Sequence, residues 1–251
     1  MGIGPAGAVR RRILWRPAPA MARCPMMKTL IRLEIVADER VDGGWLKLAR
    51  RRLRNHYADG SSSREYVADA AYRPGIDAVA VLVWRRVAGR VEVLLRQNLR
   101  PGVELRASLS PPMTDSHHAL PLLWELACGI PEADEQAPSR FAACGARELE
   151  EEMGLRVDAG ALRPLGAPTY PSGGILTEMI HFFSVEVAPD AEAGHGSGDG
   201  SPFEEVGALR WWPLTDAVSA CRRGEIADAK TELALWRLTA ALAAEPAPGG
   251  P

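Results

Sequence analysis

The sequence predicts an α+β fold that is preceded by a small β domain. Three observations support this prediction. Short strand-type runs fill residues 28–73, a pair of strands around Ala88-Gly89 begins the main part of the chain, and helical periodicity appears in its middle and at its end. With 251 residues, 47% of them hydrophobic, the chain can bury a substantial core.

The charge balance and the cysteine pattern exclude several classes of protein. Lysine and arginine number 30 against 32 aspartate and glutamate, so the net charge of −2 gives no general attraction to nucleic acid or to a membrane surface. No apolar run approaches the roughly 18 residues that a membrane-spanning helix needs. The four cysteines lie far apart without a C-x-x-C pair, which argues against a zinc ribbon or a dithiol site and favours the reducing cytoplasm.

The chain divides into four segments by composition. Residues 1–27 are expected to be a disordered extension or a start site placed too early, because three methionines precede the first structured run. Residues 28–73 contain the runs "KTLIRLEIVADERV", "WLKLARRRLRNHYA" and "REYVADAAYR", which predict strands of an N-terminal β domain. We expect the main domain over residues 74–245 and a disordered tail over 246–251.

The main domain is predicted to begin with a hairpin, because "IDAVAVLVWRR" and "RVEVLLRQNL" flank the turn signal Ala88-Gly89. The apolar run "ALPLLWELACGI" follows. A helix is predicted over "SRFAACGARELEEEMG", with Pro138-Ser139 as its start and Gly154 as its stop. The remaining elements are three strands, a long acidic and glycine-rich loop, and two closing helices: "LRPLGAPTY", "EMIHFFSVEVA", "ALRWWPL", "APDAEAGHGSGDGSPFEE", "LTDAVSACRRG" and "IADAKTELALWRLTAALAAE".

The central helix carries an acid cluster that folding alone does not favour. Glu148, Glu151 and Glu152 stand at i, i+3 and i+4, so their carboxylates project from one face, while Glu150 points away. Like charges at this spacing cost an isolated helix roughly 0.2 to 0.5 kcal/mol per pair. Arg147 can pair with one of them. A divalent cation, which prefers carboxylate oxygen, is one partner for the cluster, and a solvated charged face is the alternative.

This cluster resembles the signature of the Nudix hydrolases, G-x5-E-x7-R-E-U-x-E-E-x-G-U, where U is aliphatic. "RELEEEMGL", Arg147 to Leu155, matches every fixed position of its second half. Gly129 follows "ELAC" at the start of the signature, and Glu135 lies six residues later. Glu135 stands twelve residues before Arg147, where the signature has eight, so the literal position belongs to Ser139.

The resemblance covers roughly Thr29 to Ala244 and implies an α/β/α sandwich with a mixed sheet. Pro171, sixteen residues after Leu155 inside "YPSGGILTE", is similar to the mark of the ADP-ribose pyrophosphatases and so implies nucleoside diphosphate sugars as substrates. "LLRQNLRPG" looks like the family's strand end, and "GEIADAKTELAL" looks like its C-terminal helix entry. Residues 28–73 resemble the small domain through which such enzymes form a domain-swapped homodimer.

The resemblance also implies roles for individual residues. Magnesium, with manganese as a substitute, would be held by Glu148, Glu151, Glu152 and the backbone carbonyl of Cys128. The catalytic base would be Glu204 or Glu205 on the long loop, with Arg147 as a further catalytic residue and Glu178 as the next candidate base. Substrate would contact a further set: Arg96, Arg100, Gly129, Pro171, Gly173 and Glu178.

The expected function is therefore magnesium-dependent hydrolysis of the pyrophosphate bond of a nucleoside diphosphate sugar. ADP-ribose, giving AMP and ribose 5-phosphate, is the first choice, and a UDP-sugar or a GDP-sugar is the alternative. A second class also stays open, namely a Nudix-derived regulator that binds ADP-ribose without cleaving it. We expect a cytoplasmic homodimer with no nucleic-acid or membrane partner.

Overall fold

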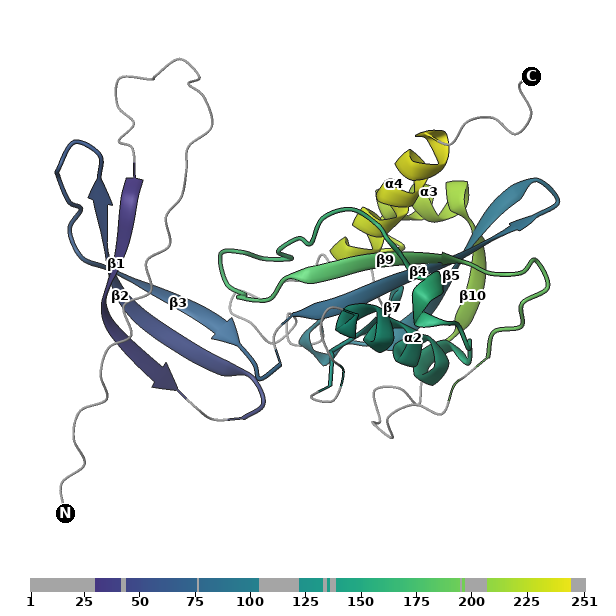
Figure 1. Ribbon diagram of the computed structural model, residues 1–251, viewed down its shortest axis with the longest axis horizontal. Coiled ribbons are helices and arrows are strands. Elements are labelled where there is room, and N and C mark those ends of the chain that lie inside the picture. Colours follow the sequence, from purple (N-terminus) through teal and green to yellow (C-terminus); the bar gives the residue numbers. More distant parts are fainter. Residues whose placement is uncertain are drawn as a thin grey trace. The chain divides into compact units, whose positions relative to one another are not determined.

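The computed structural model describes residues 30–41, 44–75, 77–103, 122–132, 135, 139–194, 196 and 207–244 (Figure 1). The chain divides into two compact units, residues 1–73 and 74–251. The segments 1–27 and 246–251, for which disorder is expected, lie outside the described residues, and so do Glu204 and Glu205.

The first unit is a three-stranded antiparallel sheet of β1 (Leu30–Val41), β2 (Lys47–Tyr57) and β3 (Tyr66–Tyr72), with β2 in the centre. The basic run of β2 is matched by acids on the neighbouring strand and turn. Arg50 donates two hydrogen bonds to Asp69, at 2.9 and 3.0 Å, and Arg54 pairs with Glu65. The charge of this strand is therefore largely compensated within the unit.

The second unit begins with the predicted hairpin, which is confirmed. Strand β4 (Ala78–Val87) runs into β5 (Arg90–Leu99) through Ala88 and Gly89. Both turn residues have positive φ, 47° and 78°, as a two-residue hairpin turn that matches the twist of its strands requires.

The hairpin strands part toward one end of the sheet, and a third segment enters between them. β4 and β5 pair with each other only from Val83 and Leu94 up to the turn. Beyond that point β6 (Leu122–Glu125) pairs with β5, and β7 (Ala127–Gly129) pairs with β4. The apolar run "ALPLLWELACGI" therefore forms two short strands on two different neighbours, with Leu126 at the change.

Three further strands complete the second sheet, and a 3₁₀ turn (Ala159–Ala161) precedes the first of them. They are β8 (Arg163–Pro164), β9 (Ile180–Glu186) and β10 (Leu209–Pro213), in the order β10-β5-β4-β9-β8. β4 and β9 are parallel, whereas the other pairs are antiparallel, so the expected mixed sheet is confirmed. The predicted strand "LRPLGAPTY" forms only in part, because Arg163 and Pro164 make the short β8 and Thr169 makes a single bridge to Ile180.

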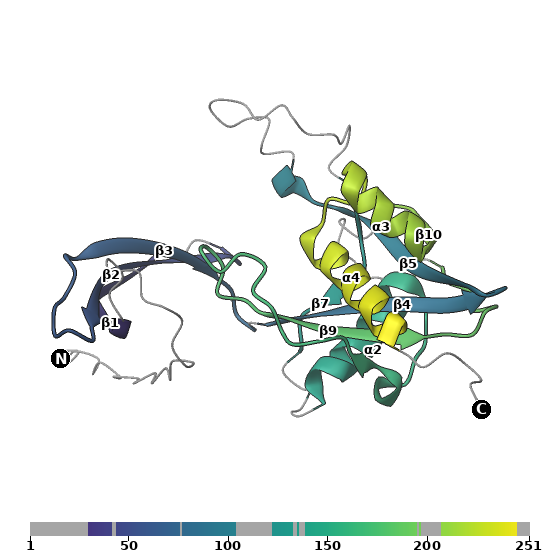
Figure 2. The same cartoon turned by 90° about the horizontal axis from the view of Figure 1, so that it is seen from above.

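Helices cover both faces of this sheet (Figure 2). α2 (Arg140–Met153) packs on one face through Leu149 and Met153. α3 (Leu214–Arg223) and α4 (Ala229–Ala244) pack on the other. The predicted α/β/α arrangement is thus confirmed. Among the described residues, no helix is long and apolar enough to cross a membrane.

Candidate active site

The central helix begins and ends where the sequence predicts. Ser139 is its N-cap and Gly154 its C-cap, with φ of 64° at the glycine, a left-handed conformation that L-residues with side chains rarely adopt. Gly145 lets the helix lie close to the sheet, since a Cβ atom there would lie 2.7 Å from Val81 Cγ2 and 2.8 Å from Leu162 Cδ2. This close approach places the acids of the helix beside β7.

Glu148 lies directly against the backbone of β7. A Cβ atom at Gly129 would fall 1.8 Å from Glu148 Oε1 and 1.9 Å from its Cδ. A larger residue at position 129 would force the carboxylate to move from this position. The Glu148 carboxylate thus lies against Gly129 of β7, and the residue itself is buried.

Arg147 connects the acids on this side of the helix. Its Nη1 lies 2.9 Å from Glu148 Oε1 and 2.7 Å from Glu151 Oε2, and its Nε lies 3.2 Å from Glu135 Oε1. Nη2 donates to the carbonyl oxygen of Ile130 at 3.1 Å. Burial works to lower the pKa of Arg147, but the charge of Glu148 and the hydrogen bond to Glu135 outweigh it and raise the pKa above its ordinary value.

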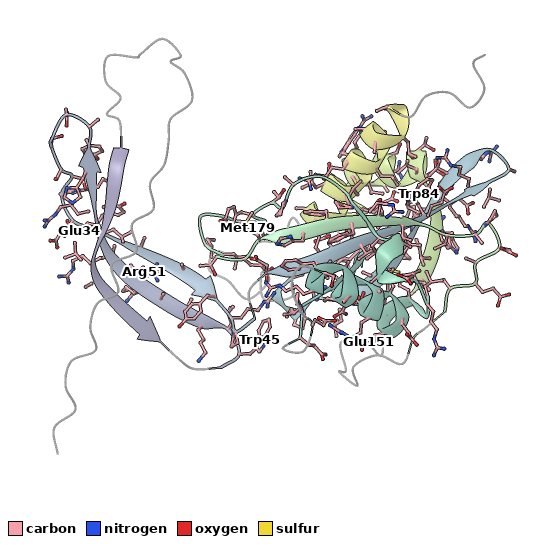
Figure 3. The ribbon with its side chains drawn as sticks, in the orientation of Figure 1. Glu34, Trp45, Arg51, Trp84, Glu151 and Met179 are labelled. Atoms are coloured by element: carbon pink, nitrogen blue, oxygen red, sulfur yellow. The ribbon has the colours of Figure 1, made fainter. Side chains whose placement is uncertain are left out.

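The remaining acids of the cluster lie on two different sides of the helix. Glu152 is buried at 6% exposure on the same side as Glu148, and Glu151 projects from α2 at intermediate exposure (Figure 3). Glu150 is exposed and pairs with Arg156 at 2.7 Å. The helix therefore presents three acids on one side and turns Glu150 away, as its periodicity predicts.

The thiols near this helix end are unreactive by environment. Burial raises the pKa of Cys128 to about 12, and burial also raises the pKa of Cys144 well above its ordinary value. The Cys128 side chain packs against the core on the α4 side of the sheet. Its backbone carbonyl is the group for which a role is expected.

The two arginines expected to bind phosphate lie on and just after β5. Arg96 is 2% exposed and pairs in register with Glu125 of β6. Arg100 donates from Nε and Nη2 to the two oxygens of Glu125, both at 2.7 Å, while its side chain stays 43% exposed. Glu125 thus fixes the Nε–Nη2 edge of the Arg100 guanidinium, and the side chain stays partly exposed to solvent.

The structure adds a buried ionic group that sequence reasoning missed. Glu125, at 1% side-chain exposure, also contacts Lys230 of α4, which donates in turn to Asp228 at 2.9 Å. Nearby, the N–H of Leu126 donates to Thr231 Oγ1 at 3.1 Å. The run "GEIADAKTELAL" contains these α4 residues, but the run itself does not indicate that they face β6.

The loop between β8 and β9 carries three of the expected substrate contacts. Pro171 and Gly173 are exposed in it, and Glu178 is partly buried near its end. The loop enters β9 at Ile180, where the N–H of Met179 donates to Asp77 Oδ1 at 2.9 Å. His181 and Gly129 flank the same residue of β4, Val79, so the end of this loop reaches the Gly129 end of the sheet.

Two glycines lie on either side of the segment that contains Glu204 and Glu205. A Cβ atom at Gly196 would lie 2.1 Å from the carbonyl oxygen of Glu151, at the end of α2. Gly207, with φ of 114°, lies against Gln97 on β5, where a Cβ atom would be 1.9 Å from the carbonyl oxygen. The chain is therefore held close to the acid helix on one side and to β5 on the other.

The family model of the NUDIX domain matches residues 77–235. The chain belongs to the Nudix family. This matched range contains α2, the buried ionic group and the loop before β9, so the site described above is the Nudix part of the molecule.

The chain is also similar to curated proteins and, in its fold, to a solved structure. The chain is 38% identical over 113 residues to a GDP-mannose pyrophosphatase of Citrobacter koseri, covering 45% of this chain and 53% of that protein. It is 35% identical over 113 residues to a GDP-mannose pyrophosphatase of Escherichia coli O139:H28, with the same coverage. The chain thus spans about half the length of the curated relatives it matches. A crystal structure of an ADP compounds hydrolase shares the fold, with a TM-score of 0.57 at 16% identity over 86% of this chain and 97% of that one.

The longer loop of this Nudix signature brings Glu135, and not Ser139, to Arg147. Glu135 Oε2 accepts from the N–H of Glu132 at 2.7 Å, which turns Oε1 toward the guanidinium. Ser139 caps α2 without a side-chain hydrogen bond. The four additional residues therefore leave the contact between acid and arginine intact.

The acid side of this Nudix helix fits a hard divalent cation as part of a larger site. Among the residues that the structure describes, no three His, Cys, Asp or Glu side chains gather into a metal-binding group. Magnesium commonly takes only one or two carboxylates and completes its shell with water and substrate phosphate. Glu148 and Glu152, with the β7 backbone beside Glu148, supply oxygen donors of that kind.

Proposed function

We propose that this protein hydrolyses the pyrophosphate bond of a nucleoside diphosphate sugar with the help of magnesium or manganese. One observation carries the proposal: Glu148 occupies the space that Gly129 of β7 leaves open, on the same helix side as Glu152. A solvated charged face would have no need of this buried fit. We infer that Glu148, Glu151, Glu152 and the Cys128 carbonyl are the metal ligands.

The side chains around the acids have distinct tasks in this proposal. The metal, when bound, offsets the charge of the diphosphate and of the leaving phosphate. Arg147 keeps Glu148 and Glu151 oriented through contacts of 2.9 and 2.7 Å. Arg100, open along one edge, binds a phosphate oxygen through a charge-assisted hydrogen bond. Arg96, which is 2% exposed and pairs in register with Glu125, remains a proposed substrate contact.

The water that attacks phosphorus must lose a proton to a base. Glu204 and Glu205 remain the proposed base candidates, although both lie outside the described residues. The positions of Gly196 against α2 and of Gly207 against β5 support the choice, because the chain between them starts and ends near the acid helix and Arg96. Glu178 is the next candidate, at the Gly129 end of the sheet.

Two substrates within this class have specific support. The offset of Pro171 from Leu155 favours ADP-ribose, and Pro171 and Gly173 are exposed and available for substrate contact. The curated relatives are GDP-mannose pyrophosphatases, which favours GDP-mannose. The relatives support only the class of substrate, because the chain spans about half of their length.

A substrate panel tests the proposal directly. The purified protein would be incubated with ADP-ribose, GDP-mannose and UDP-glucose, each with magnesium, and the products would be separated by chromatography. We expect a nucleoside monophosphate and a sugar phosphate from one preferred substrate, with no turnover when EDTA is present. Tight binding of ADP-ribose without hydrolysis would indicate the non-catalytic regulator instead.

We also propose a homodimer that forms through the first unit, in the cytoplasm. Six of the nine large apolar side chains that are exposed among the described residues belong to this unit: Val36, Trp45, Leu46, Leu48, Tyr66 and Val67. Exposed apolar surface of this kind is typical of protein interfaces. Light scattering after size-exclusion chromatography should give twice the chain mass, and Leu46→Asp with Leu48→Asp should give the monomer.

A further inference from the structure

Four charged side chains meet where β6 ends and α4 begins. Glu125 accepts two hydrogen bonds from Arg100 at 2.7 Å and contacts Lys230. Lys230 donates to Asp228 at 2.9 Å, and its side chain is only 13% exposed. Two positive and two negative groups therefore balance within one largely buried cluster, which we call the β6–α4 ion cluster.

Stability alone does not account for the β6–α4 ion cluster. Taking charged groups out of water costs several kcal/mol per ion, and well-packed apolar side chains often stabilise a protein as well as a buried ion pair does. A separate contact already ties the residue between β6 and β7 to α4, because Leu126 N–H donates to Thr231 Oγ1 at 3.1 Å. We therefore expect the buried charges to have a role other than attaching α4 to the sheet.

Arg100 is the most exposed member of the cluster, at 43% side-chain exposure against 15% or less for the other three. Its two bonds to Glu125 use Nε and Nη2, which fixes the plane of the guanidinium and leaves the edge with Nη1 for another acceptor. The hydrogen bonds to Glu125 do most to raise the pKa of Arg100 above its ordinary value, against burial, and the charge of Glu152 adds to the effect. Because its side chain is 43% exposed, Arg100 can also meet a substrate from solvent.

Lys230 holds its place through the start of α4. Asp228 accepts from Lys230 with Oδ1, while its Oδ2 accepts from the N–H and the hydroxyl of Thr231 at 2.9 and 2.6 Å. A carboxylate at this position caps the first turn of the helix. The position of the Lys230 ammonium group is consequently fixed by Asp228, which caps the helix.

We propose that Lys230 is a positioning residue for phosphate binding by Arg100. Lys230 holds the carboxylate of Glu125 in one orientation, Asp228 orients Lys230, and Glu125 fixes the guanidinium of Arg100 toward the diphosphate. The proposal rests on the function proposed above, in that it assigns Arg100 to a phosphate of the substrate.

A double-mutant cycle between Lys230 and Arg100 tests this proposal. Dissociation constants for ADP and GDP, each with magnesium, would be measured by calorimetry on wild type, Lys230→Met, Arg100→Met and the double variant. For the nucleotide that binds, each single variant should weaken binding about tenfold, the scale of one charge-assisted hydrogen bond. The double variant should bind no more weakly than Arg100→Met, because Lys230 acts through Arg100.

Two further variants separate positioning from stability. Lys230→Arg keeps the positive charge and should restore the dissociation constant to within about threefold of wild type. Leu238→Ala removes a buried apolar side chain of α4 and none of the four charged groups, so it should lower the melting temperature and yet change nucleotide binding by less than about twofold. If Lys230→Met does not fold, Asp228→Asn replaces it in the cycle, because the amide keeps the capping oxygen and loses the charge.

Several outcomes would overturn the positioning role. The first is an unchanged dissociation constant in Lys230→Met. The second is a double variant in which the effects of the two single variants on the dissociation constant multiply. The third is the absence of ADP or GDP binding by wild type. Hydrolysis of the nucleotide sugars would be measured on the same proteins. If Lys230 and Arg100 are coupled in nucleotide binding but no nucleotide sugar is hydrolysed, the proposed function is wrong and the positioning role stands. If a nucleotide sugar is hydrolysed but the effects of the two single variants multiply in the double variant, the proposed function stands and the positioning role is wrong.

Discussion

Gly129 and Glu148 compete for the same space, since a Cβ atom on the glycine would lie 1.8 Å from Oε1 of the glutamate. The Gly129→Ala variant should therefore displace the carboxylate and lower kcat/KM by about a hundredfold or more. Steady-state kinetics with magnesium would measure the loss. Gly44→Ala is the matched control, because no atom lies within 4 Å of a Cβ there. Full activity in Gly129→Ala would contradict the assignment of Glu148 as a ligand.

Glu152 and Glu150 make a second matched pair on the same helix. Glu152→Gln removes a buried negative charge at nearly constant shape, and we expect kcat to fall by roughly a thousandfold or more while the fold persists. Glu150→Gln breaks only the exposed contact with Arg156 and should keep kcat within about twofold. Circular dichroism would check the fold of both, and equal turnover in the two variants would refute the metal assignment.

Glu135 is predicted to matter more than Ser139, although Ser139 stands at the literal position of the signature. Glu135→Gln weakens the hold on Arg147, whose Nε lies 3.2 Å from the carboxylate, so kcat/KM should fall about tenfold. Ser139→Ala should cost little, because this N-cap makes no side-chain hydrogen bond. The reverse order of effects would show that the longer loop has moved the role to Ser139.

The catalytic base is tested on the segment before β10. Either Glu204→Gln or Glu205→Gln, but not both singly, should lower kcat by roughly a hundredfold or more, which is the scale of general-base catalysis. Binding of ADP or GDP should stay within about threefold of wild type, because the base acts on water rather than on substrate. If both single variants and the double variant keep full kcat, the base lies elsewhere and Glu178→Gln is the next measurement.

The fold should lose stability in acid through Glu125. Burial raises the pKa of this carboxyl, but the hydrogen bonds from Arg100 and the charge of Lys230 outweigh it and bring the pKa below its ordinary 4.5. The charged group therefore stabilises the fold above pH 4.5, and this contribution disappears as the pH falls through the lower value of the folded state.

Urea unfolding at a series of pH values would measure this dependence. Wild type should lose more of its free energy of unfolding below pH 4.5 than Glu125→Gln does, because the amide does not titrate. Two curves of equal slope would mean that Glu125 does not contribute.

The elements that the sequence predicts well are those with local signals. Ser139 and Gly154 mark the ends of α2, and Ala88-Gly89 fixes the hairpin, because capping and turn geometry depend on a few neighbouring residues. The acid face is likewise a matter of helical spacing within six residues. These features needed no knowledge of the rest of the chain.

The features that the sequence does not reveal depend on distant partners. The run around Leu126 has one apolar pattern, yet it forms two strands, because the parting of β4 and β5 decides its neighbours. Glu125 and Lys230 lie 105 residues apart, and the pattern of neither segment indicates the other. The contact of Glu135 with Arg147 is not evident from the sequence for a similar reason, since spacing along a loop does not fix where its side chains reach.

The hydrogen bond between Leu126 and Thr231 also affects the order in which parts of the protein can fold during synthesis. The hydroxyl that satisfies the Leu126 N–H is synthesised 105 residues later, together with the start of the last helix. A chain still on the ribosome can form the β4–β5 hairpin and α2, which are local, but its gap between β6 and β7 stays open. The acid helix can therefore form well before the contacts between β6 and α4, and we expect the proposed activity to appear only when α4 has emerged.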